Sequence, residues 1–447
     1  MILLRPGQLE VSQYKNGIMA VPAVPGAGKT TCLCHLATNL IEHELNSGER
    51  ILIVTVMNSA VSNFKRKMRD LLDERELPVK GFEVKTLHSL GLSILKEKPD
   101  MLLVNNAFDL LTGEERDRIL GGLTDRWLNQ NRDRWQPFLT INPEYKFYAK
   151  GLERWNQAIK DMVSNMITAI KLRGLSRSEW DQTYNAIVDY KDDSFIKWVI
   201  EIINDYNAYL KTSGRVDFDD LIVLAYRLLQ EDEALRERMQ TRWKYIFEDE
   251  AQDSTPLQEK ILQLLSEKSG NLVRVGDCNQ GIMGFSGTDP SLFQRFCKTA
   301  INQPITMASR STRDIMNFAN NYVSWVRTAF PLTECREALE EQLIVGAPDG
   351  DPFPNPMISD YGITIHEIDG EVSGELEFIA KQAAQAVKQF PDKTVAILVR
   401  ENRFNDIIAG HLTSLDVQFE SVGEGSLSSQ YSLEDVKAIL AFLAEPY

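Results

Sequence analysis

The sequence is poor in cysteine and histidine and has no long apolar run. It contains 5 cysteines and 5 histidines among 447 residues. A disulfide scaffold needs a higher cysteine content, so we expect reduced thiols and a cytoplasmic protein. Cys32 and Cys34 are two positions apart, point in different directions on a helix and would make a poor metal site. We also expect neither a membrane span nor a signal peptide, because no apolar stretch is long enough.

The composition is that of a folded protein with several domains. Hydrophobic residues make up 43% and charged residues 25% of the chain, which excludes disordered and collagen-like proteins. The net charge of −15 argues at first against a nucleic-acid partner. Much of the acidic excess, however, lies in residues 331–390, whereas the charged residues of 146–177 are mostly basic. A local basic surface can attract phosphates even on an acidic protein, although a solvated helix face explains the same pattern.

Strands and helices alternate in the first part of the chain. Residues 17–24 and 51–56 are apolar runs typical of buried strands, and a helical stretch from 30 to 44 lies between them. Further strands of this kind are expected at 245–247 and 272–276. This order predicts an α/β fold with a parallel sheet covered by helices on both faces.

Breaks in this pattern divide the chain into three parts. Residues 1–91 and 216–300 are assigned to a first α/β lobe. Residues 92–215 are too many for a loop and have helical periodicity, so we expect an inserted helical subdomain with most of the tryptophans in its core. Strands and helices resume after the Gly- and Pro-rich segment 346–356, and residues 301–447 are assigned to a second, shorter lobe. In it we expect strands at 363–368 and 394–400 and helices at 374–388, 402–415 and 433–443.

The strongest signal for chemistry is a Gly-rich segment between the first strand and the first helix. Its members are Ala23, Val24, Pro25, Gly26, Ala27, Gly28, Lys29 and Thr30. Small residues allow successive backbone N–H groups to surround phosphate oxygens at the start of a helix. Lys29 can reach the β- and γ-phosphates, and Thr30 can offer its hydroxyl to Mg²⁺. The sequence therefore predicts a phosphate-binding loop, although Ala23 replaces the usual first glycine.

An acidic pair ends a later strand. Asp249 follows an apolar run and can bind the Mg²⁺ shell, and Glu250 can orient the attacking water or accept its proton. Acidic residues at the end of a strand can also cap a helix. The phosphate-binding loop favours the catalytic interpretation.

Together these segments resemble the UvrD/Rep family of superfamily 1 DNA helicases. Segments 55–60 and 85–90 resemble its single-strand-contacting motifs, 216–221 the return to the first lobe, and 275–287 its γ-phosphate-sensing motif. By this resemblance Gln8 reads adenine, Gln280 senses the γ-phosphate, and Arg310 enters the ATP site. The DNA-contacting residues implied in the same way are Asn58, Thr86, His88 and Phe285.

The resemblance implies a P-loop NTPase with a RecA-like lobe carrying a helical insertion and a partial second RecA-like lobe. It also implies binding of ATP, Mg²⁺ and single-stranded DNA, and 3′ to 5′ movement in DNA repair or recombination. Two alternatives remain: an ATP- and DNA-binding module without unwinding activity, and a P-loop ATPase that acts on other substrates.

Several positions depart from the family pattern. Met283 and Ser286 replace a tyrosine and an arginine of the third motif, so the ATP site matches better than the DNA site. The sequence ends where the family continues into a large insertion. We therefore expect an incomplete second lobe that a further segment or a partner chain completes, and poor unwinding by the chain alone. Asp217 and Asp219 are expected to cap a helix rather than bind metal, and a helix-capping His88 and a surface Arg310 are the alternatives to their functional roles.

Overall fold

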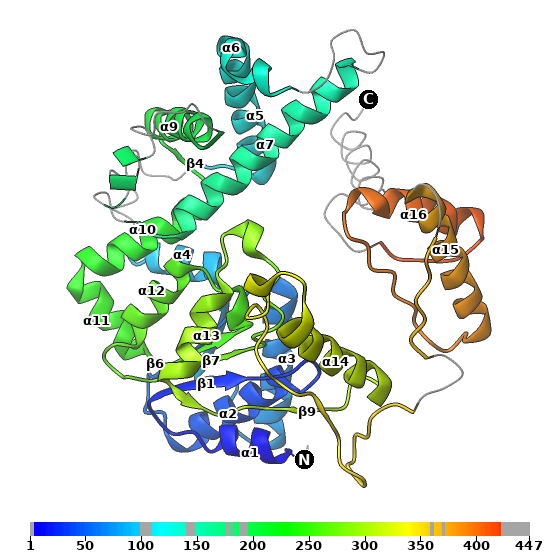
Figure 1. Ribbon diagram of the computed structural model, residues 1–447. Helices are drawn as coiled ribbons and strands as arrows, with labels where there is room; N and C mark the ends of the chain where they lie inside the picture. The colour runs from blue at the N-terminus through cyan, green and yellow to red at the C-terminus, as the bar shows by residue number, and fades with distance from the viewer. Residues whose placement is uncertain are drawn as a thin grey trace, which may run out of the picture. The chain divides into compact units, whose positions relative to one another are not determined.

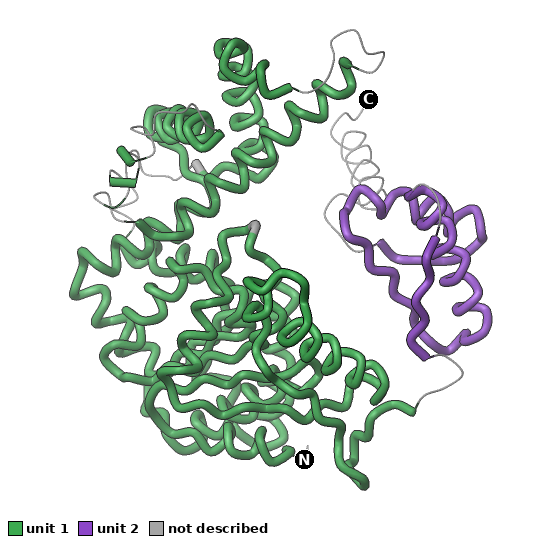
Figure 2. Tube along the Cα trace, in the orientation of Figure 1, with its two compact units in different colours: residues 1–360 green, residues 361–447 purple. Residues whose placement is uncertain are grey.

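The computed structural model describes residues 4–98, 109–139, 148–175, 195–357, 362–368 and 372–421, with a few single positions between 179 and 186. The chain divides into two compact units, residues 1–360 and 361–447 (Figure 2). None of the helices in the described ranges is long and apolar enough to cross a membrane.

A parallel sheet forms the centre of the first unit (Figure 1). Its six strands lie in the order β3-β2-β6-β7-β1-β8 and all pairs are parallel. The strands are β1 (Ile18–Pro22), β2 (Arg50–Thr55), β3 (Phe82–Thr86), β6 (Trp243–Asp249), β7 (Leu272–Gly276) and β8 (Ile301–Asn302). The α/β fold with a parallel sheet that the sequence predicts is confirmed.

Helices cover both faces of this sheet. Alternate residues of β2 belong to different hydrophobic clusters, because Ile51 and Ile53 pack on one face and Leu52 and Val54 on the other. The first face is covered by α1 (Pro6–Ser12), α2 (Lys29–His43) and α3 (Asn58–Glu74). The second is covered by α4 (Leu87–Leu95), α10 (Phe218–Glu231), α11 (Glu233–Arg242) and α12 (Pro256–Ser266). The carboxyl ends of the strands therefore share one edge of the sheet, which is where parallel α/β sheets bind ligands.

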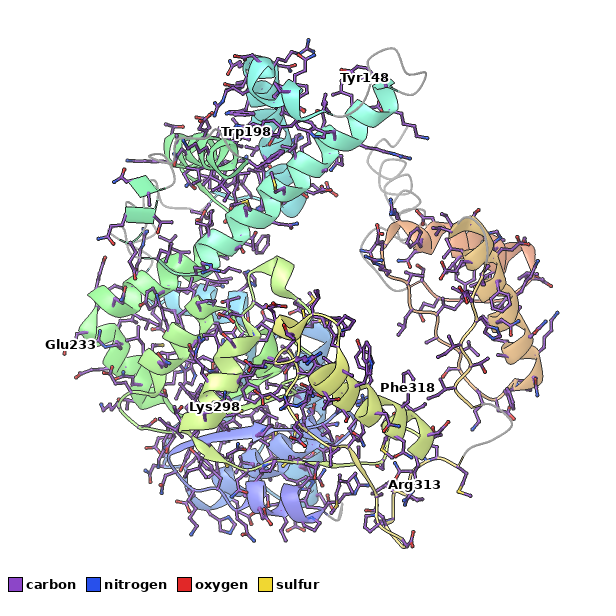
Figure 3. The ribbon with its side chains drawn as sticks, viewed as in Figure 1. Tyr148, Trp198, Glu233, Lys298, Arg313 and Phe318 are labelled. Atoms are coloured by element: carbon purple, nitrogen blue, oxygen red, sulfur yellow. The ribbon has the colours of Figure 1, made fainter. Side chains whose placement is uncertain are left out.

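The described part of residues 92–215 after α4 is largely helical and has a hydrophobic cluster of its own. It contains α5 (Gly113–Gln130), α6 (Arg132–Trp135), α7 (Tyr148–Leu172) and α9 (Phe195–Ser213), and β4 (Asp109–Leu110) pairs with β5 (Arg215–Val216). Trp127, Trp135 and Trp198 are buried in this cluster, and Figure 3 shows Trp198 among these helices. The expected core role of these three tryptophans is confirmed. The assignment of 92–215 as a separate subdomain stays a prediction.

Residues 301–360 belong to the first compact unit, although the sequence assigns them to a second lobe. Strand β8 pairs with β1, and the Ala23–Ile305 bridge continues this pairing towards the phosphate-binding loop. Beyond it lie β9 (Met307–Ala308), α14 (Arg313–Ala329) and β10 (Val345–Gly346). The sequence places the boundary between the two lobes at residue 300, but residues on both sides of this boundary pair in the same sheet. The lobe boundary therefore stays a prediction.

Two helices make up most of the described part of the second unit. They are α15 (Val372–Gln389) and α16 (Arg403–Ser414), which pack together through Leu376, Ala380 and Ile408. Both helices are expected from the sequence. The strands expected at 363–368 and 394–400 are not observed, because no described residue in these stretches pairs in a ladder. The helix expected at 433–443 lies outside the described residues.

Candidate nucleotide site

The Gly-rich segment forms a tight loop between the end of β1 and the start of α2. Gly26 and Gly28 have φ angles of 75° and 79°, in the left-handed region that favours glycine. A Cβ on Gly26 would lie 2.7 Å from Arg310 Cβ, and one on Gly28 would lie 2.8 Å from Gln8 Nε2. The two glycines therefore allow the close approach of two other candidate residues, and Lys29 begins the helix whose N-terminus faces the site.

Gln8 is held against this loop. Its Nε2 donates a hydrogen bond to Ala27 O at 2.8 Å, and its Oε1 accepts one from Arg5 N at 3.0 Å. The side chain is 7% exposed, so its orientation is fixed by these two bonds. The carboxamide thus presents one donor and one acceptor next to the phosphate-binding loop.

Lys29 and Glu250 form an ion pair at the centre of the site. Lys29 Nζ lies 2.6 Å from Glu250 Oε2, and Gln252 Nε2 donates to the same oxygen at 2.9 Å. Burial alone would raise the pKa of Glu250, but the charge of Lys29 and these hydrogen bonds lower it. Glu250 itself has φ of 56°, an uncommon conformation for a residue with a Cβ, and such strained positions concentrate at functional sites.

Asp249 ends β6 beside this pair. It is 3% exposed, and its Oδ1 has no hydrogen-bond partner among the described residues. Burial, followed by the charge of Glu250, raises the pKa of Asp249 to about 7. A buried carboxylate oxygen without a partner is costly unless a cation neutralises it. Together with the Thr30 hydroxyl it supplies the hard oxygen donors that Mg²⁺ prefers.

Few protein ligands are available for such an ion. Within the described ranges there is no group of three or more His, Cys, Asp or Glu residues that could hold a metal by itself. Mg²⁺ usually keeps several waters and binds one or two protein groups together with substrate phosphates. The donors present therefore fit Mg²⁺ bound with a nucleotide.

Gln252 connects the acidic pair to the next strand, a role that the sequence analysis missed. Its Oε1 accepts from Asp277 N at 2.9 Å, and Asp277 O accepts from Gln280 N at 3.1 Å. A Cβ on Gly276 would lie 2.6 Å from Gln252 Oε1, so the glycine is needed for this contact. Its position two residues after Glu250 indicates that it lies near the acidic pair. Only the fold shows that it bonds both Glu250 and Asp277.

Arg310 lies close to the phosphate-binding loop, as its contact with Gly26 shows. Its side chain is exposed, and its charge contributes to the lowered pKa of Glu250. The structure thus brings together five of the predicted ATP-site residues, namely Gln8, Lys29, Asp249, Glu250 and Arg310. Gln280 is exposed at the end of the turn held by Asp277.

Three of the four predicted DNA-contacting residues lie at or just after the carboxyl ends of β2 and β3, at the same edge of the sheet. Asn58 begins α3 and is exposed, and Thr86 caps α4 by accepting from Ser89 N at 3.3 Å. His88 lies in the first turn of α4, with its Nε2 3.9 Å from Asp219 Oδ1. The helix is therefore capped by Thr86, and the capping alternative for His88 is wrong.

Two further expectations concern α10 and the third motif. Asp217 caps α10 by accepting from Asp220 N, as expected, and its carboxylate also accepts from Lys171 Nζ at 2.7 Å. Asp219 lies inside the first turn, where it accepts from the Thr168 hydroxyl, so the capping role predicted for it is wrong. Phe285 lies in a 3-10 turn, Gly284–Ser286, and its side chain lies outside the described residues.

Comparison with known families decides the assignment. The UvrD/REP helicase N-terminal domain matches residues 4–301. The chain belongs to the UvrD/Rep helicase family. The resemblance inferred from the motifs is thereby confirmed, and the sheet of this UvrD/Rep chain is the RecA-like sheet of a P-loop NTPase.

Relatives of this UvrD/Rep chain are known as ATP-dependent DNA helicases. PcrA of Leuconostoc citreum is 25% identical over 446 residues, which cover 98% of this chain and 52% of PcrA. Rep of Escherichia coli (strain K12) is 25% identical over 447 residues, which cover 99% of this chain and 58% of Rep. The chain thus spans little more than half the length of these relatives.

Proposed function

We propose that this chain binds and hydrolyses ATP and couples hydrolysis to movement along single-stranded DNA, as part of an ATP-dependent DNA helicase. The observation that carries the proposal is one hydrogen-bonded path from Lys29 through Glu250 and Gln252 to Asp277. It joins the phosphate-binding loop to the turn that ends at Gln280. The names of PcrA and Rep describe proteins with this activity. The 3′ to 5′ direction, the role in repair and the cytoplasmic location rest on the sequence analysis alone.

Recognition of the nucleotide is assigned to Gln8 and the loop of residues 23–30. The Gln8 carboxamide offers a donor and an acceptor, which match the N6 amino group and N7 of adenine. The loop amides and Lys29 would bind the phosphates. Thr30 and Asp249 would hold Mg²⁺, which neutralises charge on the β- and γ-phosphates when bound.

Phosphate binding changes the environment of Glu250. Lys29 Nζ is drawn from the carboxylate to the phosphates, because both are anions competing for one ammonium group. The pKa of Glu250, which Lys29 lowers, then rises, and the carboxylate becomes a better acceptor for a water proton. Gln252 remains to orient it, and Arg310 stabilises charge on the transferring phosphoryl group.

Coupling to DNA is assigned to the turn between Asp277 and Gln280. Gln252 contacts both Glu250 and this turn, so a change at the γ-phosphate can move Gln280 and the segment that leads to Phe285. Asn58, Thr86 and His88 would contact the DNA. The division into a first lobe (1–91 and 216–300), an inserted subdomain (92–215) and a second lobe (301–447) remains part of the proposal.

The affinity for single-stranded DNA in different nucleotide states tests this coupling. Fluorescence anisotropy of a labelled oligothymidylate is measured without nucleotide, with ADP and with a non-hydrolysable ATP analogue. A motor requires affinities that differ between these states. Equal affinities in all three would support the binding-module alternative, and absence of DNA binding would support an ATPase with another substrate.

A further inference from the structure

Two free cysteines pack in the same small hydrophobic cluster beside the turn that carries Gln280. Cys278 follows Asp277 in this turn, and Cys297 lies near the end of α13 (Pro290–Thr299), next to the Lys298 that Figure 3 labels. Cys278 forms a small buried cluster with Phe293 and Ala251, and Cys297 packs against this cluster. Since Ala251 directly follows Glu250, the two sulfurs lie close to the proposed catalytic residues.

The two thiols are chemically unequal. Cys278 is 8% exposed, whereas Cys297 is partly exposed. The neighbouring Cys278 thiol lowers the pKa of Cys297 more than burial raises it, and the charge of Arg274 adds to this. In contrast, burial raises the pKa of Cys32 and of Cys34 to about 12. Since the thiolate is the nucleophile, Cys297 is the more reactive partner and Cys278 lies in position to react with it in turn.

We propose that Cys278 and Cys297 form an oxidisable dithiol site that a peroxide converts to a disulfide. The Cys297 sulfur attacks one oxygen of hydrogen peroxide and the O–O bond breaks, so that Cys297 becomes a sulfenic acid and the other oxygen leaves as water with the thiol proton. The Cys278 thiol then attacks the sulfenic sulfur, forms the S–S bond and releases a second water. Two thiols lose two electrons and two protons in total, and the peroxide is reduced to water.

The disulfide would fix the turn that carries Gln280. An S–S bond of about 2.0 Å replaces non-covalent packing and ties the turn to α13. The turn is already tied elsewhere, because Asn279 Nδ2 donates to Glu340 O at 3.0 Å and Asp277 N donates to Gln252. A turn held at all these points can no longer move Gln280 in response to the γ-phosphate. Oxidation therefore slows ATP hydrolysis, while the phosphate-binding loop can still bind ATP. This consequence rests on the proposed function, whereas formation of the bond does not.

Peptide mapping tests the site directly. The intact chain is treated with hydrogen peroxide, remaining thiols are blocked under denaturing conditions, and trypsin cleaves after Arg274, Arg295 and Lys298. We expect peptide 275–295 linked to peptide 296–298, two hydrogens lighter than their sum, and lost after reduction with dithiothreitol. Cys297→Ser and Cys297→Ala remove the linked peptide, whereas Cys335→Ser, at another partly exposed cysteine, retains it. Absence of the linked peptide at peroxide levels that oxidise Cys335 would overturn the proposal.

ATP turnover tests the consequence separately. We expect oxidation to lower turnover of the parent by about tenfold or more, because small displacements of catalytic groups have effects of this size. Dithiothreitol restores it, and Cys297→Ser is insensitive to peroxide. If the linked peptide forms but ATP turnover is unchanged, the claim that the disulfide restricts Gln280 is wrong. A parent without any ATP turnover would instead contradict the proposed function, and peptide mapping would still decide the dithiol site.

Discussion

Lys29 Nζ lies 2.6 Å from Glu250 Oε2, so the cation expected to meet the phosphates bonds the carboxylate expected to act on water. The two residues come from α2 and from the end of β6, which lie far apart in the sequence. Their pairing means that nucleotide binding exchanges one anionic partner of Lys29 for another. The ion pair thereby links phosphate binding to the basicity of Glu250, because the charge of Lys29 lowers the pKa of that carboxyl group.

Substitution of Lys29 by alanine should abolish ATP turnover and leave the fold intact. The variant loses the charge at the β- and γ-phosphates, whereas Glu250 keeps its hydrogen bond from Gln252. Turnover and binding of a fluorescent ATP analogue are measured beside circular dichroism. Lys15→Ala, at an exposed lysine, is the matched control and should behave as the parent. Turnover at the parent rate in Lys29→Ala would refute the phosphate-binding assignment.

Substitution of Glu250 by glutamine should separate ATP binding from hydrolysis. Glutamine keeps the shape but is no base, and loss of general base catalysis costs roughly 10²- to 10⁴-fold in rate. Because Lys29 loses its anionic partner, ATP should bind at least as tightly as in the parent. Equilibrium binding and single-turnover hydrolysis measure the two effects. Loss of binding comparable to that of Lys29→Ala would contradict the role of Glu250.

Substitution of Asp249 by asparagine should stabilise the protein at pH 8 in the absence of nucleotide. The folded chain holds a proton at Asp249 up to about pH 7, whereas the unfolded chain releases it near pH 3.9. The stability contributed by this group is thus fully present only below about pH 4 and is lost as pH rises towards 7. The unfolding temperature of the variant should exceed that of the parent by more at pH 8 than at pH 5. An equal difference at both pH values would contradict a raised pKa of Asp249.

The same variant should lose its response to magnesium. Mg²⁺ with ATP should raise the unfolding temperature of the parent but raise that of Asp249→Asn much less, because the amide carries no charge for the ion. Thermal unfolding with ATP alone provides the control. An undiminished Mg²⁺ effect in the variant would place the ion elsewhere.

A buried ion pair between β6 and β7 should be important for stability. Arg274 and Glu248 are 1% and 0% exposed, and Arg274 also lies 2.7 Å from Glu259. Arg274→Met leaves Glu248 buried without a counter-charge and should cost about 3–5 kcal/mol in the free energy of unfolding. Adding Glu248→Leu to this variant should restore most of the lost free energy of unfolding, because it removes the unpaired buried charge. Urea unfolding measures both, with Lys381→Ala at an exposed ion pair as the control that changes stability by less than about 1 kcal/mol.

Local patterns in the sequence predict the phosphate-binding loop, the parallel sheet and the family, because each depends on neighbouring residues and their order. Contacts between distant segments are not predicted in this way. Glu248 and Arg274 interrupt apolar runs, and only the register of β6 and β7 shows that they are neighbours. Gln252 and the Cys278–Cys297 contact likewise depend on how strand ends meet. The apolar runs at 363–368 and 394–400 indicate strands, but apolar character does not specify a pairing partner.

Steady-state ATP turnover with and without single-stranded DNA shows whether the chain couples hydrolysis by Glu250 to DNA. The 447-residue chain is assayed at saturating ATP and Mg²⁺ with increasing oligothymidylate, beside Glu250→Gln. We expect turnover that rises with DNA to a plateau in the parent and is absent in the variant. Turnover that is indifferent to DNA, or that persists in Glu250→Gln, would contradict the proposed coupling of hydrolysis to DNA.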